Sequence, residues 1–399
     1  MNQKSISGNG GIGVSHSVGY CTNVHAGTDL PSIRDSLVRY ALPVRDLVGG
    51  DSLGVGLWIP DQASRQLADE GAEDFAEFLK QRRLKAFTIN GFPFANFHQE
   101  VVKRDVYSPA WWDTERLDYT RRLAAILAVL LPENEAVGSI STLPIGWGKD
   151  VAADKIAAAG RHLRSMADSL KKLHRETGRR IVLAIEPEPG CVLDTSVDCV
   201  AFFETHLPED HHRRYVTVCH DVCHAAVMME DQRDIFSRLA TAGIGIGKIQ
   251  VSSAIVVDWD HMAIGRRREA IEQLSAFAED RYLHQTGRRR GDGVFELAED
   301  LPALISGVSD QGDPVGGDTR WVIHFHVPIF LERFGHLSTT RDDVLVALRT
   351  LNDPHKSIDF TGHFEVETYA WTVLPESMRR HGLSADIASE MQWLKEQLG

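Results

Sequence analysis

The sequence lacks an apolar run of the roughly 20 residues that a membrane-spanning helix needs. Its first 17 residues, MNQKSISGNGGIGVSHS, are polar and rich in Gly and Ser. They contain no apolar segment of the kind found in secretory signal peptides. We therefore expect residues 1–17 to form a flexible leader. We also expect that the protein does not insert into a membrane and that it is cytoplasmic.

Several catalytic signatures are also absent. The chain has no GxxxxGK[ST] loop, no glycine-rich dinucleotide fingerprint after its first strand-like run, no HExxH and no GxSxG. These absences argue against an NTPase, a dehydrogenase, a zinc protease of the HExxH class and an α/β-hydrolase.

Cysteine and positive charge are both scarce. The five cysteines are an odd number without dense spacing, which favours reduced thiols over a disulfide framework. The 43 Lys and Arg residues are outnumbered by 56 Asp and Glu residues, and the formal net charge is −13. This balance argues against a nucleic-acid partner.

Strand-like and helical segments alternate along the 399 residues. The alternation predicts βαβ units and, with eight strands, a (β/α)8 TIM barrel. The loop over residues 91–112 is enlarged, and a long insertion separates strands seven and eight. The segment 321–328 is also strand-like, so it is either the eighth strand or part of the insertion, and we favour the insertion. We expect one domain over residues 18–399. The eight predicted strands are 18–25, 53–60, 84–90, 136–144, 180–188, 215–221, 244–252 and 364–369.

Four oxygen-bearing residues, Glu186, Asp221, Gln250 and Glu367, lie at or near the C-terminal ends of predicted strands. This edge of a (β/α)8 barrel carries the catalytic groups. Three carboxylates brought together there repel one another unless a cation lies between them. The pattern therefore predicts a metal site, with Glu186 and Glu367 also placed to transfer protons.

Further polar residues flank these four. Glu188 faces the same way as Glu186 on an extended chain, and His224 follows Asp221 at the helical i+3 position. His324 and His326 alternate on one face of a strand. His224 and His324 are candidate further ligands, and Glu188 and His326 are candidate substrate contacts. The alternative is that the histidines are structural.

Three other residues are candidate substrate contacts. Lys248 shares a strand face with Gln250 and either pairs with a carboxylate, such as Glu365, or clamps a substrate anion. His25 closes the first predicted strand, and His98 lies in the enlarged loop. We expect both histidines to contact substrate.

The order of these motifs resembles the xylose isomerase-like barrel superfamily, which includes sugar isomerases, ketose 3-epimerases and endonuclease IV. Glu186 in IEPEP, Asp221 and His224 in HDVCH, and Glu367 in VETY match its ligand positions. Gln250 departs from the His or Asp that is common on strand seven. The resemblance implies that His324 and His326 correspond to an extra ligand pair found in some members.

A longer set of motifs resembles the EboE-type metabolite traffic proteins of ebo operons. These motifs are GYCTNVHAG, FTINGFPFANFH, VKRDVYSPAW, RYLHQ, HFHVPIF and FEVETYAW. The resemblance covers nearly the whole chain and implies a small-molecule pathway, of cyclitols or prenylated metabolites. It implies no particular reaction.

These observations lead to three hypotheses. The first is a metal-dependent isomerase or epimerase of a sugar, cyclitol or related polyol, with or without phosphate. Its oxygen-rich ligands favour Mn²⁺ or Mg²⁺, with Co²⁺ and Zn²⁺ as alternatives. The second is a multi-metal zinc phosphoester hydrolase, and the third is a non-catalytic metabolite-binding barrel. All three are compatible with a homo-oligomer.

Overall fold

A computed structural model describes residues 16–353, 358–379 and 381–399. The predicted leader, residues 1–17, lies outside the described residues except for its last two, and Ser17 begins the first strand. The division into a leader and one domain stays a prediction.

Eight parallel strands close into a barrel, in the order β1-β14-β7-β6-β5-β4-β3-β2. Most of their residues are buried, because the strands are covered on both faces, as parallel sheets require. The predicted (β/α)8 TIM barrel is confirmed. The barrel strands are β1 (Ser17–Cys21), β2 (Leu53–Trp58), β3 (Leu84–Asn90), β4 (Val137–Thr142), β5 (Arg180–Ile185), β6 (Val216–Asp221), β7 (Ile246–Val251) and β14 (His363–Val366).

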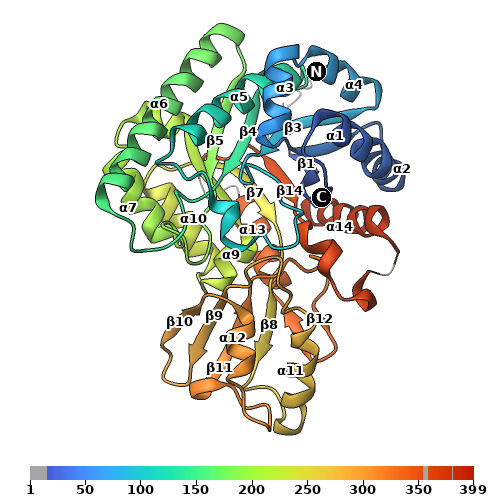
Figure 1. Cartoon of the computed structure of the whole chain (residues 1–399), viewed down its shortest axis with the longest axis vertical. Helices are drawn as coiled ribbons and strands as arrows, with labels where there is room; N and C mark the ends of the chain where they lie inside the picture. The colour runs from blue at the N-terminus through green and yellow to red at the C-terminus, as the bar shows by residue number, and fades with distance from the viewer. Residues whose placement is uncertain (1–15, 354–357, 380) are drawn as a thin grey trace, which may run out of the picture.

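Helices surround this barrel (Figure 1). Residues at the helix termini determine where the helices begin and end. Asp29 caps the N-terminus of α1 by accepting a hydrogen bond from the Ser32 amide at 2.8 Å. Gly178, at φ 73°, ends α6. The surrounding helices are α1 (Leu30–Ser36), α2 (Leu42–Val48), α3 (Asp61–Glu70), α4 (Glu73–Gln81), α5 (Thr114–Leu130), α6 (Ala153–Thr177), α7 (Ser196–His206), α8 (Asp210–Tyr215), α9 (Val222–Val227), α10 (Gln232–Thr241), α13 (Arg341–Leu351) and α14 (Leu383–Leu398).

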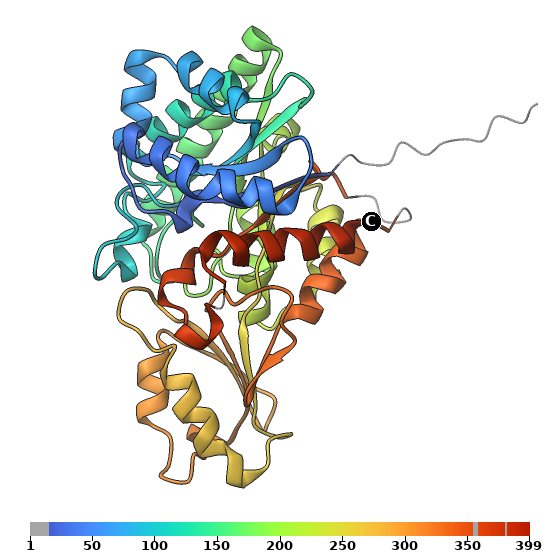
Figure 2. The ribbon, with the colours of Figure 1, turned by 90° about the vertical axis from the view of Figure 1, so that its right-hand side faces the viewer.

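The chain between β7 and α13 forms a second lobe below the barrel in Figure 1, with helices α11 (Arg267–Ser275) and α12 (Leu301–Ser306). Its six-stranded antiparallel sheet has the order β10-β9-β11-β8-β13-β12 and its own apolar core. The side view in Figure 2 shows the lobe on one end of the barrel. The segment 321–328 belongs here rather than to the barrel. The strands are β8 (Ile255–Asp258), β9 (Thr286–Arg290), β10 (Phe295–Ala298), β11 (Asp318–Ile323), β12 (Arg333–Phe334) and β13 (Leu337–Thr339).

The long connection between β3 and α5 joins the barrel to this lobe. The Val102 amide donates to the Arg281 carbonyl at 2.8 Å, and the Tyr282 hydroxyl donates to the Phe97 carbonyl at 3.2 Å. Phe97 and Val102 lie in the apolar core of the lobe. The connection and the lobe therefore cover the same end of the barrel.

Within the part of the chain that the structure describes, no helix has both the length and the apolar character needed to span a bilayer.

Candidate metal centre

Three of the predicted ligands meet at the C-terminal end of the barrel. Glu186 follows β5, Asp221 is the last residue of β6, and Glu367 follows β14. One carboxylate oxygen from each lies within 4.8 Å of the others, and all three side chains are buried. Parallel strands align their C-terminal ends, so residues far apart in sequence converge here.

The three carboxyl groups repel one another. Burial, followed by the charges of Glu367 and Asp221, raises the pKa of Glu186 well above its ordinary value. Burial and the charges of Asp221 and Glu365 do the same to the pKa of Glu367. Burial also opposes ionisation of Asp221, but the adjacent His224 and His326 outweigh it and lower the pKa of Asp221.

The free oxygens of this cluster fit a cation. Glu186 Oε2 and Asp221 Oδ2 are buried and have no hydrogen-bond partner, although buried polar atoms almost always have one. Asp221 Oδ1 is occupied by the Ser252 hydroxyl at 2.7 Å and the His224 amide at 2.9 Å. A divalent ion would satisfy the unpartnered oxygens and remove the repulsion between the carboxylates.

Two asparagines hold the third carboxylate. The side-chain amides of Asn23 and Asn90 donate to Glu367 Oε1 at 2.8 and 3.1 Å. Both contacts are made to the same oxygen, which leaves Glu367 Oε2 for a ligand. The asparagines thereby fix the orientation of this carboxylate, as outer groups do around metal ligands.

An ion pair forms the floor below the cluster. Lys248 Nζ contacts Glu365 Oε2 and donates to Ser141 Oγ at 3.3 Å, and both charged side chains are fully buried. Burial alone would lower the pKa of Lys248, but the Glu365 carboxylate outweighs it and raises that pKa. Of the two roles left open by the sequence, the structure places Lys248 in the pairing role. Its contact with substrate stays a prediction.

Three histidines form the wall next to the carboxylates. The ring centroids of His224 and His324 are 4.6 Å apart, and those of His324 and His326 are 5.4 Å apart. Each Nδ1 faces an oxygen acceptor: Pro187 O at 2.9 Å for His224, Gln285 Oε1 at 2.8 Å for His324, and Glu367 O at 3.1 Å for His326. Each Nδ1 therefore carries the proton, and each Nε2 offers a lone pair.

The arrangement of these lone pairs also fits a metal. His224 Nε2 and His324 Nε2 are only 3.2 Å apart. Two nitrogens bound to one tetrahedral Zn²⁺ at roughly 2.0–2.1 Å would be separated by about 3.3 Å. His326 Nε2 is buried without any partner and lies 3.9 Å from Asp221 Oδ2. Burial lowers the pKa of His326 to about 4, which keeps the ring neutral and available as a ligand.

A model of the xylose isomerase-like TIM barrel family matches residues 46–280, more than half of the chain. The chain belongs to this family. A search of curated proteins gives no match.

Solved structures of the same fold are distant in sequence. A xylose isomerase-like TIM barrel protein from Mycobacterium smegmatis in complex with magnesium has 13% identity and a TM-score of 0.52, over 96% of this chain and 97% of that one. An IolI protein with a bound zinc atom has 13% identity and a TM-score of 0.46, over 96% and 97%. A D-tagatose 3-epimerase-like protein has 10% identity and a TM-score of 0.45, over 96% of each chain.

Two other predicted residues of this xylose isomerase-like barrel adjoin the centre, and Glu188 has an oxygen within 4.8 Å of nitrogens of His224 and His324. Glu188 Oε1 accepts hydrogen bonds from the Tyr107 hydroxyl at 2.7 Å and from Gln285 Nε2 at 3.3 Å. Gln250 is fully buried, and neither atom of its amide has a hydrogen-bond partner. Its role as a neutral ligand stays a prediction.

The two predicted substrate histidines lie away from the carboxylates. His25 Nε2 contacts the Tyr20 hydroxyl at 3.0 Å, and the ring stacks on Tyr40 at 4.5 Å. His98 Nε2 contacts the Asn23 carbonyl at 2.7 Å. Neither histidine lines the cavity above the carboxylates. Contact with substrate stays a prediction for both.

Sequence reasoning missed several residues at the centre: Asn23, Asn90, Ser252, Gln285 and Tyr369. Asn90 ends β3 and Asn23 follows β1, so the strand-end rule that found Glu186 applies to them also. Ser252 directly follows β7 and Tyr369 lies shortly after β14, so the same rule reaches them. Gln285 comes from the inserted lobe, where no local pattern marks its position.

The cavity above the carboxylates is small, at about 50 Å³. A volume of this size has room for an ion and a few water molecules but not for a six-carbon polyol. Apolar side chains from the enlarged loop form part of its wall, so a polyol requires these side chains to move. The cavity is lined by Asn23, Asn90, Phe92, Pro93, Phe97, Val106, Glu186, His224, His324, Glu367 and Tyr369.

Proposed function

We propose that this protein is a metal-dependent isomerase or epimerase of a sugar, cyclitol or related polyol, with or without a phosphate group. The observation that carries the proposal is the buried group of Glu186, Asp221 and Glu367. It has unpartnered oxygens on Glu186 and Asp221 and adjoins a cavity that Glu186 and Glu367 line. The oxygen-rich ligand set favours Mn²⁺ or Mg²⁺. The magnesium in the M. smegmatis structure agrees with this choice.

The proposed roles follow from the contacts. Glu186, Asp221 and Glu367 would hold a divalent ion, which would supply Lewis-acid polarisation of the substrate. Glu186 and Glu367 follow different strands and both line the cavity, so they can remove and return a proton at a substrate carbon. Asn23 and Asn90 keep the Glu367 carboxylate oriented. The wall from the enlarged loop excludes water during proton transfer.

Proton exchange with solvent tests this function without knowledge of the product. The Mn²⁺-loaded protein should incorporate deuterium from D₂O at the carbon next to a carbonyl, in at least one member of a panel of ketoses, keto-cyclitols and their phosphates. Proton NMR detects the exchange. EDTA should abolish it, and Mn²⁺ should restore it. Absence of exchange across the panel, with the metal bound, would contradict the proposal.

The histidine wall favours a second candidate, a multi-metal phosphoester hydrolase. Its basis is the pair of Nε2 atoms at 3.2 Å on His224 and His324, a spacing that fits Zn²⁺. Release of inorganic phosphate from a phosphoester panel, without deuterium incorporation, would support this candidate over the isomerase. The EboE-type resemblance is a finer proposal, and it is compatible with either reaction on a small molecule.

Metal binding should stabilise the protein more at high pH than at low pH. The pKa values of Glu186 and Glu367 are raised, so the folded apoprotein holds protons that the unfolded chain releases near pH 4.5. The apoprotein therefore loses stability as pH rises from that value through the raised pKa values. Mn²⁺ replaces these protons, and at 100 times its Kd it adds about 2.7 kcal/mol.

Scanning calorimetry of EDTA-treated protein, with and without Mn²⁺, measures this effect at pH 5.5 and pH 8. We expect a shift in Tm of several degrees at pH 8 and a clearly smaller one at pH 5.5. Glu367→Gln should show little shift at either pH. Equal shifts in the wild-type protein at both values would contradict the placement of the ion among these carboxylates.

A further inference from the structure

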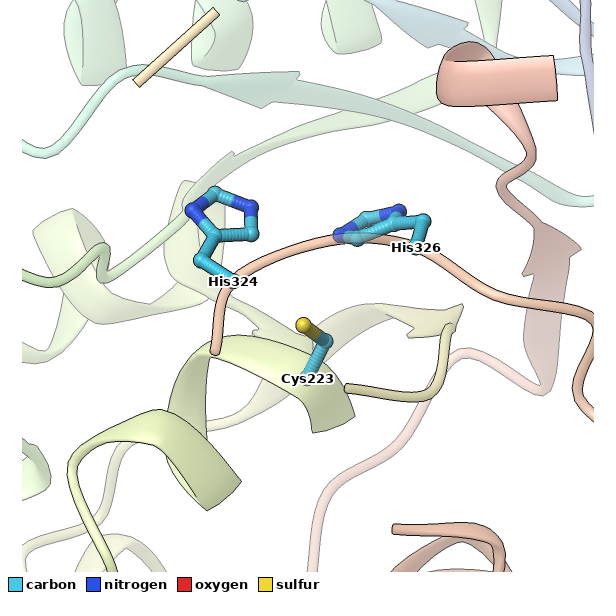
Figure 3. A group of neighbouring side chains, drawn as sticks. All are labelled: Cys223, His324 and His326. Carbon is cyan, nitrogen blue, oxygen red and sulfur yellow. The ribbon is translucent and has the colours of Figure 1, made fainter. Parts of the chain in front are cut away.

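Cys223 lies beside His324 and His326, two of the three histidines next to the carboxylates. It is fully buried on α9, and its sulfur lies within 4.8 Å of a nitrogen from His324 and one from His326. Figure 3 shows the thiol pointing from α9 toward the gap between the two rings. Cys223 forms no disulfide. The thiol and the two imidazoles are therefore buried neighbours.

One of the two rings, that of His326, has a buried nitrogen without a partner. His326 Nε2 is buried and has no hydrogen-bond partner, because Nδ1 is the atom held by the Glu367 carbonyl. His324 Nδ1 is held by Gln285 Oε1, which directs its Nε2 toward His224 Nε2 at 3.2 Å and the Tyr369 hydroxyl at 3.4 Å. An unpartnered buried imidazole nitrogen is costly unless a proton or a metal ion occupies it.

Simple packing explains part of this environment but not all of it. Cys223 also touches an apolar cluster that includes Ala226 and Val256, which accounts for its burial. It does not account for the unpartnered nitrogen of His326. Burial and the Asp221 carboxylate raise the pKa of the Cys223 thiol well above its ordinary value, and the backbone N–H of Phe325 offsets only part of this rise. The thiol therefore keeps its proton until a metal ion displaces it.

We propose that Cys223, His324 and His326 form a second metal subsite, selective for zinc or a similarly soft divalent ion. One thiolate and two imidazoles are a zinc ligand set, whereas Mg²⁺ and Mn²⁺ prefer carboxylates and water. His224 Nε2, 3.2 Å from His324 Nε2, can supply a fourth donor. Binding of the ion releases the thiol proton to solvent.

This subsite adjoins the carboxylate group through Asp221, which lies within 4.8 Å of donor atoms in both His326 and Glu186. The centre would then have two positions: one for a soft ion such as Zn²⁺ on the lobe side, and one for a hard ion such as Mg²⁺ or Mn²⁺ on the barrel side. The inference does not rest on the proposed isomerase reaction. It requires only that the thiolate bind an ion.

Cobalt substitution tests the subsite directly. One equivalent of Co²⁺ added to the reduced, metal-free full-length protein should produce a thiolate-to-cobalt charge-transfer absorption in the near ultraviolet. Cys223→Ser and Cys223→Ala should lose this band. Competition with a chromophoric chelator should show zinc affinity weakened by about 100-fold or more in both variants. Cys199→Ala removes another buried cysteine and should leave both measurements unchanged.

Two further variants test whether misfolding explains the loss of the band and distinguish failure of this subsite from failure of the proposed function. His326→Gln keeps the thiol and should weaken zinc binding, with a shifted cobalt spectrum. Glu367→Gln should lose the hard ion but keep the charge-transfer band. Absence of the band in the wild-type protein, or its persistence in both Cys223 variants, would overturn the proposal.

Discussion

Glu367→Gln should lower kcat/KM by roughly 1,000-fold, equivalent to about 4 kcal/mol, and should lose the carboxylate-bound ion with it. The substitution keeps a side-chain oxygen for Asn23 and Asn90, so the local packing is preserved. It removes one of three negative charges from the ligand set and one proton-transfer group from the cavity. The two losses should therefore appear together.

Elemental analysis and deuterium exchange on the best substrate of the panel measure the two losses. Glu396→Gln makes the same chemical change at an exposed position on α14 and should change neither quantity. A Glu367→Gln protein that retains full manganese occupancy would exclude Glu367 as a ligand. One that loses manganese but retains exchange would exclude the ion from the reaction.

The position of the carboxylates could be predicted because their signal is local. A short apolar run followed by a polar residue marks a strand end, and closure of the barrel brings such ends together. This rule alone predicts the positions of Glu186, Asp221 and Glu367. The fold itself follows from the same alternation of strand-like and helical segments, and it is confirmed.

The remainder of the centre depends on long-range contacts that no local pattern contains. Asn23 and Glu367 are 344 residues apart, and Gln285 reaches Tyr107 across 178 residues. The position of Gln285 depends on how the inserted lobe packs on the barrel. A single sequence does not encode that packing as a periodicity or a spacing. The tautomers of the histidines depend on the same long-range contacts, so they could not be predicted from the sequence either.

The second prediction concerns the ion pair below the site. Lys248→Met should lower the free energy of unfolding by about 3–5 kcal/mol, because it leaves the Glu365 carboxylate buried without its partner. Glu365 Oε1 also lies where a Cβ on Gly56 would be, so the carboxylate has little room to move toward water. It must take up a proton to remain buried. The loss should therefore be larger at pH 8 than at pH 5.

Urea unfolding followed by circular dichroism measures the loss in free energy of unfolding. Two further variants identify its cause. Lys172→Met breaks an exposed pair with Glu176, at 3.8 Å, and should cost no more than about 0.5 kcal/mol. Lys248→Met combined with Glu365→Leu removes both buried charges and should recover most of the stability, because apolar residues replace a buried pair at little cost.

If the double variant is as unstable as the single one, loss of packing around Lys248 rather than an unpaired charge causes the effect. If Lys248→Met is as stable as the wild type, the pair is not structural, and the role of Lys248 as a substrate anion clamp becomes the stronger interpretation.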